Sequence, residues 1–255
     1  MAIVKITIHS ICPPTVLPKI YETNYLDLPT REHIKQALEI VPINLKAIIL
    51  FMSSSGTAKA ETLSLTVEQF VNGTKEYHNR GSIKHVLDTL ENKTNVVPIF
   101  YLRRIKTDKF YYTFCSPEAS YYIVKYLKTR HDLKLKDKLF DFSNSLLLTR
   151  FQEINDKMNW GFKGKYRFFR SHTLRKFHAS NLGLSAEYID SLQGRSKNMV
   201  HATYIKTNPT KLKEIYKSAM KNIMIYDNKI EKKKIKEEFN ITINVFLSDK
   251  QINLM

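Results

Sequence analysis

The sequence contains few glycines, few cysteines and no long apolar stretch. Seven glycines among 255 residues argue against a glycine-rich phosphate loop and against a loop-rich all-β fold. Cys12 and Cys115 belong to no CxxC or Cys/His motif, so neither a disulfide framework nor a zinc site is indicated. The longest apolar run, residues 47–52, is too short to span a membrane. Because the N-terminus also lacks a signal-peptide pattern, we expect a cytoplasmic protein without metal ions or other cofactors.

Acidic residues are scarce relative to basic ones. The chain has 41 Lys and Arg against 24 Asp and Glu, a formal net charge of +17, which favours a polyanionic partner such as nucleic acid. An AT-rich genome that encodes lysine often is the alternative. However, no acid lies between Asp156 and Glu187 or between Asp190 and Glu214, and both windows are rich in bases. The candidate DNA contacts in these windows are Lys163, Lys165, Arg167, Arg170, Lys176 and Lys197.

Composition divides the chain into three parts. Residues 1–29 carry four prolines and a short alternating stretch, which predicts an extended lead-in or linker remnant. Residues 30–225 carry the periodic apolar patterns of a folded domain. Residues 226–255 form a basic tail that ends in ITINVFL, a terminal strand with no neighbour nearby in sequence.

Helix signals dominate the first part of the folded region. Thr30 is a plausible N-cap for a helix that ends at Pro42. A second helix runs into the polar bend SSSGT, and a further short helix starts near Lys59. Thr66 with Gln69 predicts a capping box for the next helix.

Residues 94–116 are instead rich in β-branched and aromatic residues, with Thr107 and Asp108 between two such runs, which predicts a β-hairpin. Ser116 and Pro117 then open a helix. The remainder reads as helical, with breaks near 130–143, 160–170, 183 and 194. The predicted fold class is therefore mainly α with a small antiparallel β-sheet (α+β).

The segment from 172 to 204 contains an ordered set of polar residues. His172 and Arg175 share a helix face because they are three residues apart. Alone, such a pair is typical of a solvated helix face. A short helix follows, ending at Gly194; Arg195 comes next, and Tyr204 lies nine residues further on.

These elements, HTLR at 172–175, LQGR at 192–195 and Tyr204 in HATYIK, resemble the tyrosine recombinase/integrase family. The arginine in LQGR, where many members have histidine, is similar to the archaeal and archaeal-virus branch. Upstream, SSSGTAKAETLSLTVEQF (53–70) resembles the family block that includes Glu61, and RRIKTDKFYYTFCSPEA (103–119) resembles the hairpin that carries its catalytic lysine. We assign that lysine to Lys106 in preference to Lys109.

The resemblance implies a tyrosine recombinase catalytic-domain fold and a reaction. Tyr204 would attack a DNA phosphate and form a 3′-phosphotyrosyl link, which conserves the bond energy, so that rejoining needs neither metal nor ATP. Arg175 would bind the phosphate bidentately, and His172 would accept the tyrosine proton. Arg195 would donate a hydrogen bond to the phosphate, and Lys106 would protonate the leaving 5′-oxygen.

The resemblance fails at one catalytic position. The first arginine of the family lies two residues after the glycine of the 53–70 block, and that position here is Ala58. Loss of one such donor typically lowers the rate by about 10²–10³. We expect Lys59 to supply the missing charge. A slow enzyme and a decayed one are the alternatives.

The chain also differs from the family at its ends. About thirty residues precede the catalytic helices, too few for the N-terminal core-binding domain of full integrases, so we expect either a solitary catalytic domain or a truncated product. We expect residues 239–247 to pair with the 97–114 hairpin, in cis or in a neighbouring protomer, which would support a homo-oligomer on DNA. A disordered tail is the alternative.

The leading prediction is a site-specific recombinase or integrase of a mobile element that acts on double-stranded DNA and associates with the nucleoid when bound. The alternative is a catalytically weak or inactive DNA-binding remnant or regulator. The sequence leaves open the target site and the choice between integration and excision.

Overall fold

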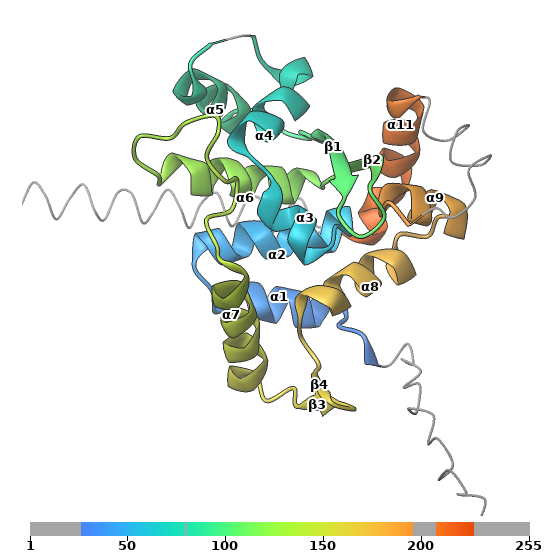
Figure 1. The fold of residues 1–255 in the computed structure, drawn as a ribbon. Coiled ribbons are helices and arrows are strands. Elements are labelled where there is room, and N and C mark those ends of the chain that lie inside the picture. Colours follow the sequence, from blue (N-terminus) through green and yellow to red (C-terminus); the bar gives the residue numbers. More distant parts are fainter. Residues whose placement is uncertain (1–26, 80, 196–207, 227–255) are drawn as a thin grey trace, which may run out of the picture.

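The structure, a computed structural model, describes residues 27–79, 81–195 and 208–226 (Figure 1). The helices are α1 (Arg31–Glu39), α2 (Ile43–Ser55), α3 (Lys59–Ser64), α4 (Val67–Gly73), η2 (Lys75–Tyr77), α5 (Ile83–Glu91), α6 (Pro117–Lys128), α7 (Asn144–Lys157), α8 (Ser171–Asn181), α9 (Ala186–Leu192), α11 (Pro209–Ala219) and η3 (Met220–Asn222). The strands are β1 (Ile99–Arg104), β2 (Lys109–Phe114), β3 (Phe162–Lys163) and β4 (Tyr166–Arg167). The predicted class, mainly α with a small antiparallel sheet, is confirmed.

Local capping determines where several helices begin. The Thr30 hydroxyl accepts the backbone N–H of the third residue of α1, and Thr66 does the same for α4, where Gln69 reciprocates in a capping box. Ser116 caps α6, whose first residue is Pro117. All three starts were predicted from sequence, because a cap depends on only four consecutive residues.

Helix α2 lies at the centre of the fold. It packs against α6 on one side and α8 on the other (Figure 1). Every side chain from residue 47 to 55 is buried, so the helix is covered all round rather than along one stripe. The Phe51 ring packs edge-on against Phe100 of β1 and also contacts Phe140, with ring centroids 5.3 Å apart in both pairs. The hydrophobic core therefore joins the helices to the hairpin.

The C-terminal end of α2 is fixed by hydrogen bonds from other elements. The hydroxyls of Ser54 and Ser55 donate back to carbonyls of the preceding turn, both at 2.7 Å. The terminal carbonyls, which no helical N–H can reach, accept from side chains: Tyr216 Oη donates to Ser54 O at 2.9 Å, and Thr113 Oγ1 to Ser55 O at 3.0 Å. These bonds place the bend after α2 beside β2 and α11.

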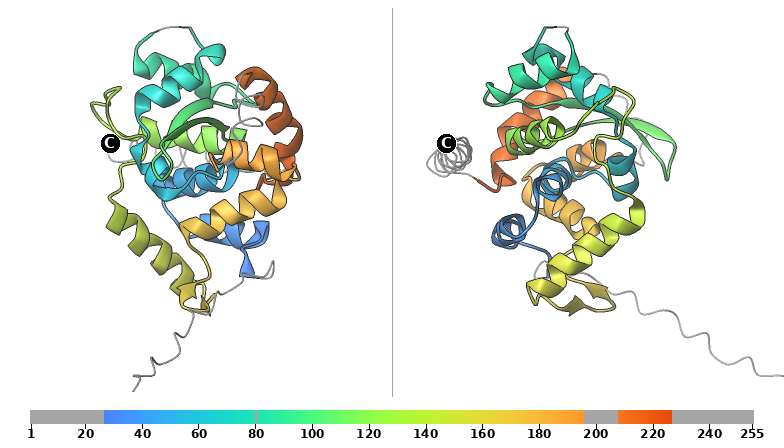
Figure 2. Two further views of the ribbon diagram at one scale, coloured as in Figure 1. Left: turned by 45° about the vertical axis from the view of Figure 1, so that its right-hand side comes forward. Right: turned by 90° about the vertical axis from the view of Figure 1, so that its left-hand side faces the viewer.

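Strands β1 and β2 form the predicted antiparallel hairpin, with paired residues from Ile99↔Phe114 to Arg104↔Lys109. The turn occupies residues 105–108, and Asp108 has a left-handed conformation (φ 54°). Helix α3 packs against β1 and α9 against β2 (Figures 1 and 2). The hairpin thus lies between α3, which follows the polar bend after α2, and α9, which precedes Gly194 and Arg195.

The region 160–170, predicted only as a break between helices, contains a second hairpin, β3–β4. Asn155 at the end of α7 holds the segment in place, since its amide donates to Gly161 O at 3.1 Å and its carbonyl oxygen accepts from Phe169 N at 2.8 Å. With two residues in each strand, this hairpin is too short to produce a visible alternation in the sequence.

The last described residues are attached to the start of α6. The carboxylate of Glu118 accepts from the backbone N–H groups of Ile225 and Tyr226, at 2.9 and 2.6 Å. The predicted terminal strand at 239–247 and most of the lead-in 1–29 lie outside the described residues. Within the described ranges, no helix is long and apolar enough to cross a membrane.

Candidate active site

Arg175 joins three separate segments of the chain. Arg175 lies on α8 and its side chain is buried. The guanidinium donates from Nη1 to Gly56 O at 2.5 Å and from Nη2 to Gln193 O at 2.8 Å. The carbonyls belong to the bend after α2 and to the end of α9. A guanidinium carries five N–H groups, so these two bonds fix its plane while leaving capacity for an oxyanion.

Gln193 arranges the groups around Arg175. It is fully buried, and its amide nitrogen donates to Arg175 O at 3.1 Å and to His178 Nδ1 at 2.9 Å. Its carbonyl oxygen accepts from the guanidinium of Arg195, with Nε at 2.7 Å and Nη2 as a second donor. Gln193 therefore holds both guanidinium groups, that of Arg175 through its backbone carbonyl and that of Arg195 through its side chain.

Two glycines allow this close approach. Gly56 has φ +63°, and a β-carbon there would lie 2.6 Å from both Gln193 Nε2 and His178 Nδ1. Gly194 has φ +64°, and a β-carbon there would lie 2.6 Å from the ring of Tyr111. Both positions require glycine, for backbone conformation and for space.

A buried carboxylate lies beside these arginines. Glu61 of α3 is only 2% exposed; its Oε1 accepts from the backbone N–H of Ile105 at 3.3 Å and lies 3.5 Å from Nη1 of Arg104, the last residue of β1. The phenol of Tyr111, on β2, is buried in the same region. Burial raises its pKa, and the charge of Glu61 raises it further while Arg175 and Arg104 act in the opposite direction.

Positive charge is concentrated at this point. Burial, together with repulsion from Arg104 and Arg195, lowers the pKa of Arg175 to about 10. Burial likewise lowers the pKa of Arg195, which Asp190 at 4.0 Å offsets in part. Three guanidinium groups from β1, α8 and the end of α9 are thus near neighbours, and such a cluster binds an anion favourably.

His172 is neutral at physiological pH. Its surroundings lower its pKa to about 4, through partial desolvation of the ring and through the nearby charges of Arg170, Lys176, Arg175 and Arg195. His172 is exposed to solvent and lies on the same face of α8 as Arg175, three residues away. A neutral imidazole in this position can accept a proton.

The other predicted catalytic residues have different surroundings. Ala58 is the N-cap of α3 and Lys59 its first residue. Lys106 is exposed in the hairpin turn, and Lys109 begins β2. In the described part of the chain, no hydrogen bond or ion pair joins either Lys59 or Lys106 to Arg175. Tyr204 lies outside the described residues.

Most of the predicted DNA contacts belong to β3–β4 and the start of α8. Lys163 is 3.4 Å from Asp27, and Arg167 forms a bidentate ion pair with Asp156 at 2.8 Å for both bonds. These two predicted DNA contacts are therefore paired with acids in the folded chain, and their contact with DNA stays a prediction. Acids from elsewhere in the chain reach them in space, which sequence windows cannot register.

Two other bases of this group contact the exposed ring of Tyr166. The Lys165 ammonium lies 5.3 Å from the ring centroid and the Arg170 guanidinium 4.3 Å from it. Lys176 lies one helical turn after His172 on α8. Lys197 lies outside the described residues. The hairpin thus presents cations and aromatic rings together.

Several residues of the site were assigned no role from the sequence, among them Gln193, Arg104 and Tyr111. Gln193 stands in the quoted LQGR, and Arg104 in the quoted RRIK, so both lay inside recognised blocks. In those two blocks the catalytic roles were assigned to Arg195 and Lys106 instead. Among the described residues, no group of three or more His, Cys, Asp or Glu side chains could hold a metal ion.

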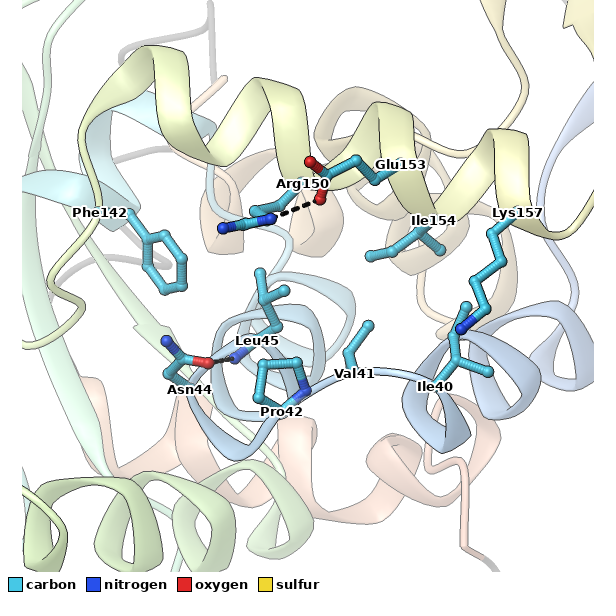
Figure 3. A pocket seen from close by; sticks show the side chains of 10 residues that line it. All are labelled: Ile40, Val41, Pro42, Asn44, Leu45, Phe142, Arg150, Glu153, Ile154 and Lys157. Atoms are coloured by element: carbon cyan, nitrogen blue, oxygen red, sulfur yellow. Dashed lines mark hydrogen bonds and ion pairs between the residues drawn. The ribbon is translucent and has the colours of Figure 1, made fainter.

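A cavity of about 400 Å³ lies away from this cluster, between the α1–α2 connection and α7 (Figure 3). Val41, Pro42, Leu45 and Ile154 form its apolar wall. The rim is polar, with an ion pair between Arg150 and Glu153 at 2.7 Å. The cavity contains none of the clustered arginines, so the candidate site is the Arg175 region.

Comparison with known proteins found no matching family model and no matching curated protein. Among solved structures, the crystal structure of the XerA recombinase is similar, with a TM-score of 0.49 and 17% identity over 81% of this chain and 66% of that one. The XerH site-specific recombinase, bound to its difH substrate in a pre-cleavage complex, gives 0.45 and 13% over 82% and 56%. The chain thus spans less than two thirds of those chains. With both TM-scores below 0.5, function has to be inferred from this chain's own side chains.

Proposed function

We propose that this chain is a DNA strand transferase of the tyrosine recombinase class, which cleaves and rejoins double-stranded DNA through a 3′-phosphotyrosyl intermediate. The observation that supports this most directly is the anchoring of Arg175 by Gly56 O and Gln193 O, with Arg195 held by the same glutamine. A phosphodiester is attacked readily only when fixed cations neutralise its non-bridging oxygens. These residues provide such a cradle from segments that also match the quoted family blocks.

The proposed reaction assigns one role to each group. The Tyr204 hydroxyl attacks the scissile phosphorus, its proton passes to neutral His172, and the bond to the 5′-oxygen breaks. Lys106, on the exposed turn two residues after Arg104, protonates that leaving oxygen. Arg175 and Arg195 hold the non-bridging oxygens. Rejoining is the reverse: the 5′-hydroxyl attacks the phosphotyrosyl group and Tyr204 departs with its proton restored.

The wider setting follows from the family resemblance. Residues 30–225 would form the catalytic domain and residues 226–255 a basic tail. The arginine at 195 favours the archaeal or archaeal-virus branch, and we assign the chain to integration or excision of a mobile element. No step in the scheme uses a metal ion or ATP, so the reaction should proceed in EDTA without nucleotide.

A nicked duplex tests this proposal. The full chain is incubated in EDTA with a pool of randomised duplexes that each carry a nick. The short fragment with the released 5′-hydroxyl then diffuses away, which traps the covalent intermediate. A protein–DNA adduct that survives boiling in detergent is expected, and sequencing the trapped DNA would reveal the preferred site. Tyr204→Phe should abolish the adduct, while Tyr101→Phe, altered at an exposed phenol on β1, should retain it.

The outcomes separate the two functional classes. Duplex binding without any adduct would refute the strand transferase and favour a DNA-binding module that lacks catalysis. An adduct that persists in Tyr204→Phe would refute the assignment of the nucleophile, because the phosphotyrosyl bond requires that hydroxyl.

A further inference from the structure

The cation missing at position 58 has a counterpart in another part of the fold. Ala58 is the N-cap of α3, and its methyl side chain carries no charge that could stabilise a phosphate. Arg104, at the end of β1, has a guanidinium within the same cluster as Arg175 and Arg195. The hairpin therefore supplies a third arginine to the site from a different element.

Arg104 is held in a defined place. Oε1 of Glu61 accepts a hydrogen bond from the backbone N–H of Ile105 and lies 3.5 Å from Nη1 of Arg104. One carboxylate therefore holds both the backbone at the end of β1 and the Arg104 side chain. The Glu61 side chain is 3% exposed and that of Arg104 is 14% exposed. An ion pair this enclosed has a much more definite geometry than a surface pair.

The pairing is incomplete within the protein. Arg104 Nη1, Glu61 Oε2 and Tyr111 Oη are buried and have no hydrogen-bond partner among the described residues. A buried polar atom destabilises the fold while it is left unsatisfied. The Arg104 side chain as a whole keeps 14% of its surface exposed, so an anionic ligand can approach it.

Charge in the cluster is also unbalanced. Three guanidinium groups face one buried carboxylate, Glu61, and one exposed acid, Asp190, which lies 4.0 Å from Arg195. Excess positive charge with restricted access to water favours binding of an anion with several oxygens.

We propose that Arg104 is a catalytic residue that binds the scissile phosphate in place of the missing arginine at position 58, and that Glu61 is its positioning residue. This inference rests on the proposed strand transfer. It differs from the expectation that Lys59 supplies the charge, because in the described part of the chain no hydrogen bond or ion pair joins Lys59 to the Arg175 cluster.

Substitution of Arg104 in the nicked-duplex assay tests the inference. Arg104→Ala should slow adduct formation by about 10²–10³, the usual effect of losing one transition-state donor. Arg103→Ala is the matched control, since Arg103 is exposed on the opposite face of the same strand and pairs with Asp108. That variant should react at the wild-type rate.

A methylphosphonate duplex distinguishes charge stabilisation from a structural role. Replacing one non-bridging oxygen by methyl removes the negative charge that Arg104 is proposed to neutralise, so the defect of Arg104→Ala should shrink on this substrate. Ala58→Arg should restore part of the activity of Arg104→Ala. Glu61→Gln should slow the reaction, but the double variant with Arg104→Ala should be no slower than Arg104→Ala alone.

Circular dichroism and melting temperature verify that each variant folds. If Arg104→Ala does not fold, Arg104→Lys keeps the ion pair with Glu61 but loses bidentate binding, and should slow the reaction at least tenfold.

A wild-type adduct with an Arg104→Ala rate within threefold of wild type would overturn the role of Arg104 and leave the proposed function intact. An equal defect on phosphate and methylphosphonate would assign Arg104 a structural role and also overturn the inference. Absence of any adduct from the wild-type chain would refute the proposed function and the role of Arg104 together.

Discussion

Buried His178 makes the stability of the site depend on pH. Its ring is fully buried beside Arg175, and Nδ1 accepts the Gln193 amide, so it is neutral in the folded protein; burial lowers its pKa to about 3 from an ordinary value of 6.5. Between these values the unfolded chain binds more protons than the folded one. The contribution of His178 to stability is therefore complete above about pH 6.5 and is lost as the pH falls toward 3.

We expect the free energy of unfolding to fall by about 1.4 kcal/mol for each pH unit below 6.5 on account of this group. Urea unfolding of wild type and His178→Gln between pH 7.5 and 4 checks this, and the variant should show a shallower dependence. The control is His85→Gln, at an exposed position of α5, which should keep the wild-type slope. Equal slopes for wild type and His178→Gln would contradict the expectation.

Gly56 and Gly161 provide a matched pair of substitutions. Both residues have a left-handed backbone conformation, with φ of +63° and +65°. A β-carbon at position 56 would clash with Gln193 and His178, whereas a β-carbon at position 161 would have no atom within 4 Å. Each Gly→Ala change incurs backbone strain of about 1–2 kcal/mol. Gly56→Ala should lose at least about 2 kcal/mol more than Gly161→Ala in denaturant unfolding. Similar losses would show that the bend after α2 can relax.

Among the secondary-structure elements, the β3–β4 hairpin has the clearest proposed role in DNA binding. Its Lys165 stacks near Tyr166 and forms no ion pair in the described part of the chain, whereas Arg167 is paired with Asp156. Paired and unpaired bases on the same hairpin should therefore contribute differently to phosphate binding.

Lys165→Ala should weaken duplex binding and reduce the slope of log K against log salt by about one. Arg167→Ala should have a smaller effect on the slope, because its charge is already neutralised by Asp156. Titrations of fluorescent duplex at several salt concentrations measure both quantities. Lys93→Ala, at an exposed position beyond α5, serves as the control. A larger effect at Arg167 than at Lys165 would contradict the assignment.

For the molecule as a whole, the buried side chains form a single core that extends from Ile34 to Ile225. Trp160, the only tryptophan in the chain, lies at the edge of this core near β3–β4. Its ring centroid is 5.1 Å from that of buried Phe169, so its fluorescence reports on this part of the core. A continuous core favours a single cooperative transition.

Tryptophan fluorescence and far-UV circular dichroism should therefore change at the same urea concentration. An earlier fluorescence transition would show that α7 and β3–β4 unfold separately from the rest. Asn155→Ala, which removes the two hydrogen bonds from the Asn155 side chain to this segment, should lower the midpoint of the common transition.

The features that could be read from the sequence are those that depend on neighbouring residues. Thr30, Thr66 and Ser116 marked helix starts correctly, because each cap bonds to a backbone group three residues away. The β1–β2 hairpin was likewise predicted from its two short apolar runs and its turn. The HxxR spacing placed His172 and Arg175 on one helix for the same local reason.

Contacts between distant segments could not be read in this way. The pairing of Arg104 with Glu61, of Arg167 with Asp156 and of Gln193 with Arg175 each brings together residues that are 11 or more positions apart. Such proximity depends on how α2, α8, α9 and the hairpin pack. Composition and periodicity constrain which faces are buried, but they do not specify which polar groups meet once the faces close.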